Sequence, residues 1–236
     1  MNPDALQKDH LNHLSVDCVI FGFHGGDLQV LLLEWKEINK WALPGGFIKV
    51  REHADEAANR VLKERTGLSD IYLRQFHVFT DPDRNKLDDD RDISLFSGNF
   101  SKESIHWITG RFVSIGYYAL VDFSKVSPVP DMFSEECRWW KLDQLPNLIY
   151  DHNHIVDSAL ISLRNALQYQ SIGKYVMPIK FTLPELQRFY ETILGQNMDR
   201  RNFRKKILNA HIIQPLGETR KTGAHKSPEL YSYNKD

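Results

Sequence analysis

Two short segments contain charged side chains whose types and spacing are suited to catalysis or binding. The first is a row of carboxylate and guanidinium groups at intervals of four residues, which a helix would place on one face. Its members are Glu52, Glu56, Arg60 and Glu64. The second segment, residues 199–209, reads DRRNFRKKILN and is rich in cations that could reach nucleic acid. The first row can equally be a solvated, ion-paired face worth a few tenths of a kcal/mol per pair.

Glu56, Arg60 and Glu64 of the first row are expected to lie on a helix over residues 53–66, which Glu52 directly precedes. Apolar residues recur there at helical spacing, and Gly67 can end the helix. These apolar residues are Ala54, Ala57, Ala58, Val61 and Leu62. The row of charges would therefore face away from a buried stripe.

Runs of β-forming residues on both sides of that helix predict an α+β fold. Val16–Phe23 and Asp27–Glu34 are separated by His-Gly-Gly, a hairpin signature. Further strands are expected over 71–79, 112–121 and 136–142, with Trp139 and Trp140 on opposite faces, a turn over 43–47 and an amphipathic helix over 154–170. Residues 85–109 are irregular and contain an acidic run, which predicts a surface insertion; a lid or an ion-binding loop is the alternative.

The second segment belongs to a series of short elements at the end of the chain. We expect a strand over 175–181, a helix over 183–194 capped by Thr182, and a turn over 195–197. A helix from Asp199 to about residue 210 and strands over 212–216 and 230–233 follow. With the helix over 154–170 placed first, this is the element order of a winged helix.

Charge separates the two parts of the chain. The 236 residues carry a net charge of −1, which taken whole argues against a nucleic-acid binder. Residues 174–236 hold 12 Lys or Arg and 6 Asp or Glu, a net +6, whereas residues 1–173 hold 18 and 25, a net −7. We therefore divide the chain into an acidic domain (1–173) and a basic domain (174–236). Two cysteines exclude a disulfide framework, and without a signal-like N-terminus we expect a cytoplasmic protein.

The segment around the first row resembles the Nudix box. The family's pattern is Gly, five residues, Glu, seven residues, then Arg-Glu-apolar-any-Glu-Glu-any-Gly-apolar. The matching residues are Gly46, Glu52, Arg60, Leu62, Glu64, Gly67 and Leu68, preceded by a Trp41–Gly46 segment typical of the family. The resemblance implies a Nudix α/β/α sandwich with a mixed sheet, in which an ion pair between Glu52 and Arg60 braces the loop against the helix.

The sequence departs from the box at two positions that matter for chemistry. Val61 and Arg65 stand where the family has glutamates that hold Mg²⁺ or Mn²⁺ for hydrolysis. A lone Glu64 seldom holds a divalent ion, and Arg65 adds a positive charge there. We therefore expect no catalytic residues, metal or cofactor, with Gly46, Glu52, Arg60 and Glu64 as a vestigial box. The alternative is an active Mg- or Mn-dependent hydrolase of nucleoside diphosphate derivatives, with carboxylates from elsewhere, such as Glu56.

The basic helix of the second domain is expected to read DNA. Its DNA-binding candidates are Arg200, Arg201, Asn202, Arg204 and Lys205, while Phe203 and Ile207 would face the core. Arginine pairs with guanine, asparagine with adenine, and lysine mostly with phosphate. The following loop would be the wing, with Arg220, Lys221, His225 and Lys226 near the DNA backbone or minor groove. A solubilising surface or a protein interface is the alternative.

The whole chain resembles the Nudix-related transcriptional regulators, bacterial proteins that join a usually impaired Nudix domain to a C-terminal winged helix. Besides the box, the resemblance rests on Gly110–Ala119, Cys137–Trp140, Phe203–Ile207 and Gly223–Lys226. It implies a homodimer on palindromic double-stranded DNA and an effector that is a sugar or an ADP-ribose-like nucleotide. A non-catalytic protein-interaction module is a third alternative.

The effector is expected to bind in the Nudix domain. The candidate ligand-binding residues are Trp41, Phe47, Glu64, Arg84 and Arg111, although both aromatic residues can equally belong to the core. The run Tyr150-Asp-His-Asn-His154 has the composition of a metal site. Asp151 is nevertheless expected to cap the following helix, so no metal is predicted there.

Overall fold

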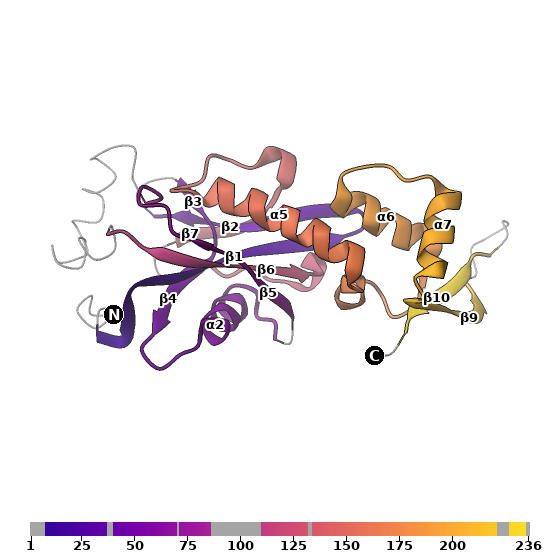
Figure 1. Ribbon diagram of the computed structural model, residues 1–236, viewed down its shortest axis with the longest axis horizontal. Coiled ribbons are helices and arrows are strands. Elements are labelled where there is room, and N and C mark those ends of the chain that lie inside the picture. The colour runs from indigo at the N-terminus through magenta and orange to yellow at the C-terminus, as the bar shows by residue number, and fades with distance from the viewer. Residues whose placement is uncertain are drawn as a thin grey trace.

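The computed structural model describes residues 8–36, 40–69, 71–85, 110–131, 134–220 and 227–234. It has two parts that lie end to end, a sheet covered by helices and a smaller helical part at the C-terminal end (Figure 1). Most of the predicted insertion (86–109) and the predicted wing tip (221–226) lie outside the described residues. None of the helices in the described ranges is both long enough and apolar enough to cross a membrane.

Strand β1 (His10–His24) organises the sheet. It pairs antiparallel with β2 (Asp27–Trp35) and parallel with β6 (Val113–Val121). Gly25 and Gly26 form the turn between β1 and β2 with φ angles of 61° and 96°, a region that favours glycine. The predicted hairpin is therefore confirmed.

Within the described ranges, seven strands form one mixed sheet. The remaining four are β3 (Lys40–Ala42), β4 (Gly45–Lys49), β5 (Tyr72–Phe79) and β7 (Ser134–Lys141). The main path runs β3-β2-β1-β6-β5, while β4 pairs with β1 and β7 pairs with β2. The predicted turn over 43–47 is wrong for Gly45, Gly46 and Phe47, because their backbone pairs with β1 from Ser15 to Asp17.

One helix covers each face of the sheet (Figure 1). Helix α2 (Ala54–Thr66) follows His53 and ends at Gly67, whose φ of 72° is left-handed. Helix α5 (His152–Tyr169) covers the opposite face, and each helix buries its own apolar cluster against the sheet. Trp139 packs in the α2 cluster and Trp140 in the α5 cluster, as their alternation predicts. The predicted α/β/α sandwich with a mixed sheet is confirmed.

The C-terminal part has the element order of a winged helix. It comprises β8 (Phe181–Thr182), α6 (Leu183–Leu194), α7 (Arg200–Asn209), β9 (Ile213–Thr219) and β10 (Glu229–Tyr233), with the strands in the order β8-β10-β9. Short 3₁₀ turns occupy Phe123–Lys125, Leu142–Gln144 and Ile172–Tyr175. The predicted strand over 175–181 is wrong except at its last residue, because the chain turns at Ile172–Tyr175 and pairs only at Phe181–Thr182.

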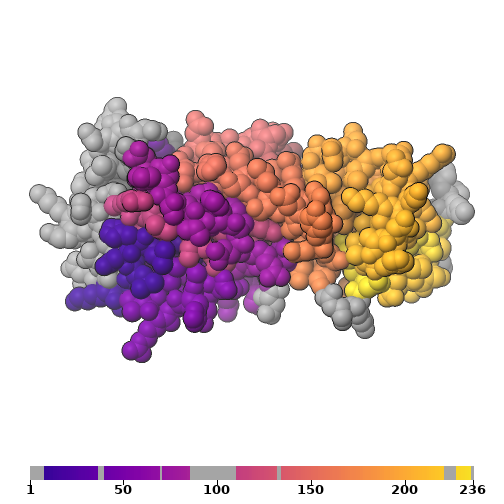
Figure 2. Space-filling model, viewed as in Figure 1, coloured from indigo at the N-terminus to yellow at the C-terminus, as the bar shows by residue number. Residues whose placement is uncertain are grey.

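The two parts share α5. Its Arg164 Nε donates a 2.9 Å hydrogen bond to the Ile193 carbonyl at the end of α6. The Phe23 and Phe189 rings meet edge to face, 4.9 Å apart, and one apolar cluster continues from the sheet into α6 and α7. Figure 2 shows the C-terminal part seated directly against the end of the sandwich. Helix α5 thus serves as the first helix of the winged helix as well as a cover of the sheet.

Candidate nucleic-acid interface and candidate ligand-binding residues

The arginine of the box segment fixes β4 to α2. Arg60 donates from Nε and Nη2 to the two Glu52 carboxylate oxygens at 2.8 and 2.9 Å, and from Nη2 to the Phe47 carbonyl at 3.1 Å. These hydrogen bonds, with a further one from the Lys49 backbone, hold the pKa of Glu52 below its ordinary value despite the opposing effect of burial. The predicted brace between Glu52 and Arg60 is confirmed.

Glu64, on the same face of α2, lies between two guanidinium groups. Its carboxylate oxygens are 3.9 Å from Arg60 Nη1 and 3.2 Å from Arg65 Nη2, and the side chain is 46% exposed. Arg65 also donates to the Val129 carbonyl at 3.1 Å, so it is held beside Glu64. Val61 is 1% exposed and belongs to the core under α2. Among the described residues, no group of three or more His, Cys, Asp and Glu could hold a metal ion.

A buried ion cluster joins β1, the start of α5 and the segment before residue 86. Arg84 has a side chain only 3% exposed and donates to both Asp151 oxygens, at 2.9 and 3.0 Å, and to Asp17 at 3.1 Å. Asp151 stands at the N-cap position of α5, but its side chain caps no backbone N–H, so the predicted capping role is wrong. The reason is that Arg84 engages both of its oxygens.

His152 closes the cluster from the side of α5. Its Nδ1 accepts a 3.0 Å hydrogen bond from the Leu43 backbone N–H, so that nitrogen carries no proton. Its Nε2 lies 3.9 Å from an Asp17 oxygen. Burial lowers the pKa of His152, although Asp17 and Asp151 oppose this shift. The imidazole is therefore neutral and serves as a fixed acceptor between β3 and α5.

Two of the predicted ligand-binding aromatics lie in different surroundings. Trp41 is 7% exposed, meets Trp140 edge to face at 5.0 Å and lies 4.6 Å below the Arg138 guanidinium. Phe47 is partly exposed and packs on Phe112, with ring centroids 4.9 Å apart. Arg138 also stacks on Trp140 at 4.4 Å. Sequence reasoning missed Arg138, whose only signal was its place between Cys137 and the two tryptophans.

The five predicted ligand-binding residues do not converge on one point. Trp41 packs in the cluster under α5, whereas Glu64 projects from α2 on the opposite face of the sheet. Arg84 is buried and ion-paired, while Arg111 is exposed and donates to the Thr80 carbonyl at 2.9 Å. A hydrogen bond from Asn85 to the Gly110 carbonyl (3.2 Å) brings the two flanks of residues 86–109 together beside Arg84 and Arg111.

Helix α7 separates its apolar and basic residues. Phe203 and Ile207 are buried, with 2% and 3% exposure, while the cations of the helix are exposed. These cations are the predicted DNA-binding residues Arg200, Arg201, Arg204 and Lys205, together with Lys206. The Asp199 carboxylate caps the helix through the Asn202 backbone N–H at 2.9 Å, which leaves the exposed Asn202 side chain for other partners. The helix thus presents a basic face to solvent.

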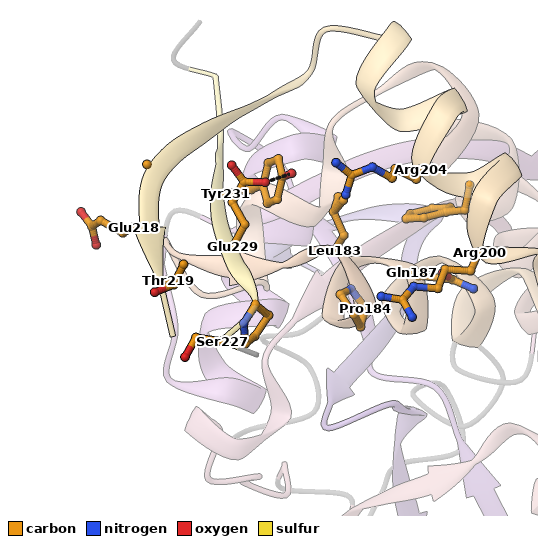
Figure 3. A pocket seen from close by; sticks show the side chains of 13 residues that line it. Leu183, Pro184, Gln187, Arg200, Arg204, Glu218, Thr219, Ser227, Glu229 and Tyr231 are labelled. Carbon is orange, nitrogen blue, oxygen red and sulfur yellow. Dashed lines mark hydrogen bonds between the residues drawn. The ribbon is translucent and has the colours of Figure 1, made fainter. Parts of the chain in front are cut away.

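A cavity of about 600 Å³ lies between α6, α7 and the two wing strands. Arg200 and Arg204 line it from α7, and Glu218 and Glu229 from the wing strands (Figure 3). The Arg204 side chain extends toward Tyr231, whose hydroxyl donates to Glu229 at 2.5 Å. The predicted wing residues Lys221, His225 and Lys226 lie outside the described residues, whereas Arg220 is described and its guanidinium contacts Glu185.

The two parts of the chain match two known domain families. The profile of the NUDIX domain matches residues 11–159, and that of the NrtR DNA-binding winged helix domain matches residues 173–233. The ADPR responsive transcriptional repressor NtrR of Acinetobacter baylyi is 29% identical over 93% of this chain and 81% of its own length. An RNA pyrophosphohydrolase of Erythrobacter litoralis is 30% identical over 55% of this chain and 76% of its own.

A solved structure is similar to this chain across both of its parts. The crystal structure of Shewanella oneidensis NrtR complexed with a 27mer DNA matches with a TM-score of 0.69 and 26% identity, over 94% of this chain and 93% of that chain. The match therefore spans both the sandwich and the C-terminal part. The chain belongs to the Nudix family, and its Nudix domain is joined to a winged helix domain of the NrtR type.

Proposed function

We propose that this chain is a transcriptional repressor that binds DNA through its winged helix and senses ADP-ribose, or a related nucleotide or sugar, through its Nudix domain. The observation that carries the proposal is the exposed basic face of α7 above buried Phe203 and Ile207. A helix so placed in a winged helix can enter the major groove. The likeness to an ADP-ribose responsive repressor, over 93% of this chain and 81% of that protein, supports the same conclusion.

We further propose that the Nudix domain binds its ligand without hydrolysing it. The residues of α2 do not fit the metal set of the hydrolases, since Val61 is buried in the core and Glu64 faces the guanidinium groups of Arg60 and Arg65. A divalent ion needs several oxygen ligands, and two nearby positive charges oppose it. No step of the proposed mechanism therefore requires a metal or cofactor.

The proposed effector site lies where the flanks of residues 86–109 meet the sheet. Arg111 has exposed donors for a phosphate or ribose, and Phe47 offers a partly exposed ring for stacking. Arg84 would support this site from beneath, because it is buried and donates to Asn85 at the edge of this segment. Glu64 would join the site only if the ligand extends across to α2.

The proposed mechanism is a shift in population between two arrangements of a homodimer. Two copies of α7 would read two halves of a palindromic operator, about one or two helical turns apart. A ligand that prefers one arrangement changes the spacing of the two winged helices. A coupling of about 1–3 kcal/mol, or roughly 5–150-fold in affinity, suffices for regulation. We assign effector binding to residues 1–173 and DNA binding to residues 174–236.

Fluorescence anisotropy with DNA from the region upstream of the gene tests DNA binding. We expect binding at sub-micromolar protein in moderate salt, and weaker binding of a variant that replaces Arg200, Arg201 and Arg204 by Ala. Lys63→Ala, an exposed cation on α2, is the matched control and should bind normally. Equal binding by the triple variant and the control would refute the assignment to α7.

A thermal-shift screen and a hydrolysis assay test the sensor. ADP-ribose, dinucleotides, sugar phosphates and pentoses are screened, and a hit is expected to change operator binding. The same ligands are incubated with Mg²⁺ or Mn²⁺ and assayed for nucleotide release. Release that is abolished by Glu64→Gln would establish a hydrolase and overturn the non-catalytic proposal. If no ligand shifts the unfolding temperature, the sensor proposal fails.

A further inference from the structure

One arginine at the base of the wing strands contacts the first turn of α6. Arg220, which directly follows β9, donates from Nη1 to Glu185 Oε1 and from Nη2 to the Lys180 carbonyl at 3.3 Å. Its backbone N–H donates to the Pro228 carbonyl at 2.9 Å, across the base of the wing. Arg220 was predicted to contact DNA, yet its guanidinium is already engaged within the protein.

The two carboxylate oxygens of Glu185, the partner of Arg220, have different hydrogen-bond donors. Glu185 Oε2 accepts from the Thr182 backbone N–H at 2.7 Å and from the Thr182 hydroxyl at 3.0 Å, which completes the capping box of α6. Oε1 faces Arg220. Burial raises the pKa of Glu185, but hydrogen bonds from Thr182 and Arg220 outweigh it and the net shift is downward. The carboxylate is therefore ionised when it holds the wing.

A second ion pair holds β9 itself. Lys180 Nζ donates to both oxygens of Glu218, at 2.9 and 2.6 Å. The Lys180 carbonyl also accepts a hydrogen bond from Arg220. Lys180, which precedes β8, therefore contacts both β9 and the residue that follows it. Both Arg220 and Glu185 remain over a third exposed, with side-chain exposures of 38% and 41%. These interactions therefore orient the wing more than they stabilise the fold.

We propose that Arg220 and Glu185 form a positioning pair that sets the wing strands β9 and β10 against α6 and α7, and that Arg220 acts on DNA through the position of these strands instead of by neutralising a phosphate. This inference rests on the proposed DNA binding. It follows from two features together: the guanidinium is bound on both Nη atoms, and its carboxylate partner is anchored by the helix cap. An arginine so paired releases few DNA counterions.

A double-mutant cycle on Arg220 and Glu185 tests the pair. Glu185→Gln is chosen because glutamine also completes a capping box, so α6 keeps its cap while the ion pair is removed. We expect Glu185→Gln and Arg220→Ala each to weaken operator binding about two- to fivefold, as for an exposed pair, and the double variant to be no weaker than either. If Glu185→Gln tightens binding, Arg220 has been released onto DNA and the proposal is overturned.

The dependence on salt separates positioning from phosphate neutralisation. The slope of log affinity against log salt becomes shallower by about 0.9 for each phosphate that the protein no longer neutralises. We expect Arg220→Ala to keep the wild-type slope, whereas Arg201→Ala, which removes an exposed cation from α7, should reduce its magnitude by about that amount. A slope change for Arg220→Ala equal to that of Arg201→Ala would overturn the proposal.

The exchange rate of the Arg220 backbone amide tests the pair without DNA, and so independently of the proposed function. The amide of Arg220 is protected by its bond to Pro228, and both single variants should raise its exchange rate by a similar factor (Arg220→Ala being followed at the same backbone position). If the wild-type chain bound no DNA, the proposed function would fail, and the effect of the pair on the wing would still be measured. Unchanged exchange in Glu185→Gln would refute the pair itself.

Discussion

Arg60 and Val61 are neighbours on α2 with separate tasks. Arg60 donates to Glu52 and to the Phe47 carbonyl, and so fixes β4 to the helix. Val61 points into the core under the same helix, where it is 1% exposed. The fold of the box needs the first residue, whereas the hydrolytic family uses a carboxylate at the second. The fold can therefore persist without the metal ligands.

Glu52→Gln should lower the free energy of unfolding by about 1.5–3 kcal/mol at pH 7, the usual worth of hydrogen bonds to a charged group. The folded pKa of Glu52 lies below its ordinary 4.5, so its contribution is present above that pH and is lost as the pH falls through the folded value. Urea unfolding from pH 7 to pH 3 should thus show the two proteins converging in acid. Glu135→Gln, at an exposed site on β7, is the control; a pH-independent difference would contradict the assignment.

Arg204→Ala should relax base preference at one position of each half-site and cost roughly 1–3 kcal/mol on the preferred operator. The reason is that an arginine on the exposed face of α7 can pair with both acceptors of a guanine. Titration against operators with single-base changes measures this. A uniform loss across all operator variants would show that Arg204 contacts only phosphate.

At the scale of single residues, local pattern predicted some interactions and missed others. The Glu52–Arg60 pair followed from the box resemblance, because both residues have fixed places in the motif. The cluster of Arg84 with Asp17 and Asp151 did not, because Arg84 lies 67 positions along the chain from each of its two partners. Arg138 on Trp41 was missed for the same reason. Chain separation, not residue type, set this limit.

At the scale of elements, strong end signals predicted the boundaries well. Thr182 and Gly195 bound α6 as predicted, since capping box and left-handed glycine are local features. The predictions failed where pairing with a distant strand decides the conformation. Gly45–Lys49 is a strand only because β1 lies beside it, and β8 is short because it meets β10 over two residues.

Asp199 provides an element-scale prediction at the start of α7. Asp199→Ala should destabilise the winged helix by about 0.5–2 kcal/mol, because the cap on the Asn202 N–H is removed. Asp199→Asn keeps a capping oxygen and removes a negative charge beside the basic face, so it should bind DNA more tightly without loss of stability. Thermal unfolding and anisotropy measure the two effects. Equal destabilisation by both substitutions would argue against the cap.

At the scale of the whole molecule, α5 connects the Nudix domain to the winged helix domain. Its N-terminal end meets the Arg84 cluster, and its Arg164 bonds to the end of α6. The helix spans about 27 Å at 1.5 Å per residue. The tip of the β1–β2 hairpin adds a second connection, in which Thr192 donates to the Gly26 carbonyl at 3.0 Å. A rearrangement at the cluster can thus reach α6 through rigid elements.

The shared core predicts one cooperative unfolding transition for the full chain. Residues 174–236 expressed alone should lack such a transition, because Phe189 would be without Phe23 and α6 without α5. Calorimetry and circular dichroism measure both. Two separate transitions in the full chain, or a cooperative melt of the fragment, would contradict this expectation.

Helix α5 also limits how regulators of this kind can be recombined. A chimera joined near residue 173 would bring a foreign first helix to α6 and α7, and the edge-to-face packing of Phe23 on Phe189 would be mismatched. To exchange the Nudix domain for that of another regulator, the winged helix must keep the α6-facing side of α5 and the tip of the β1–β2 hairpin. The segment that has to stay with the winged helix is therefore larger than residues 174–236, the domain expected from the sequence.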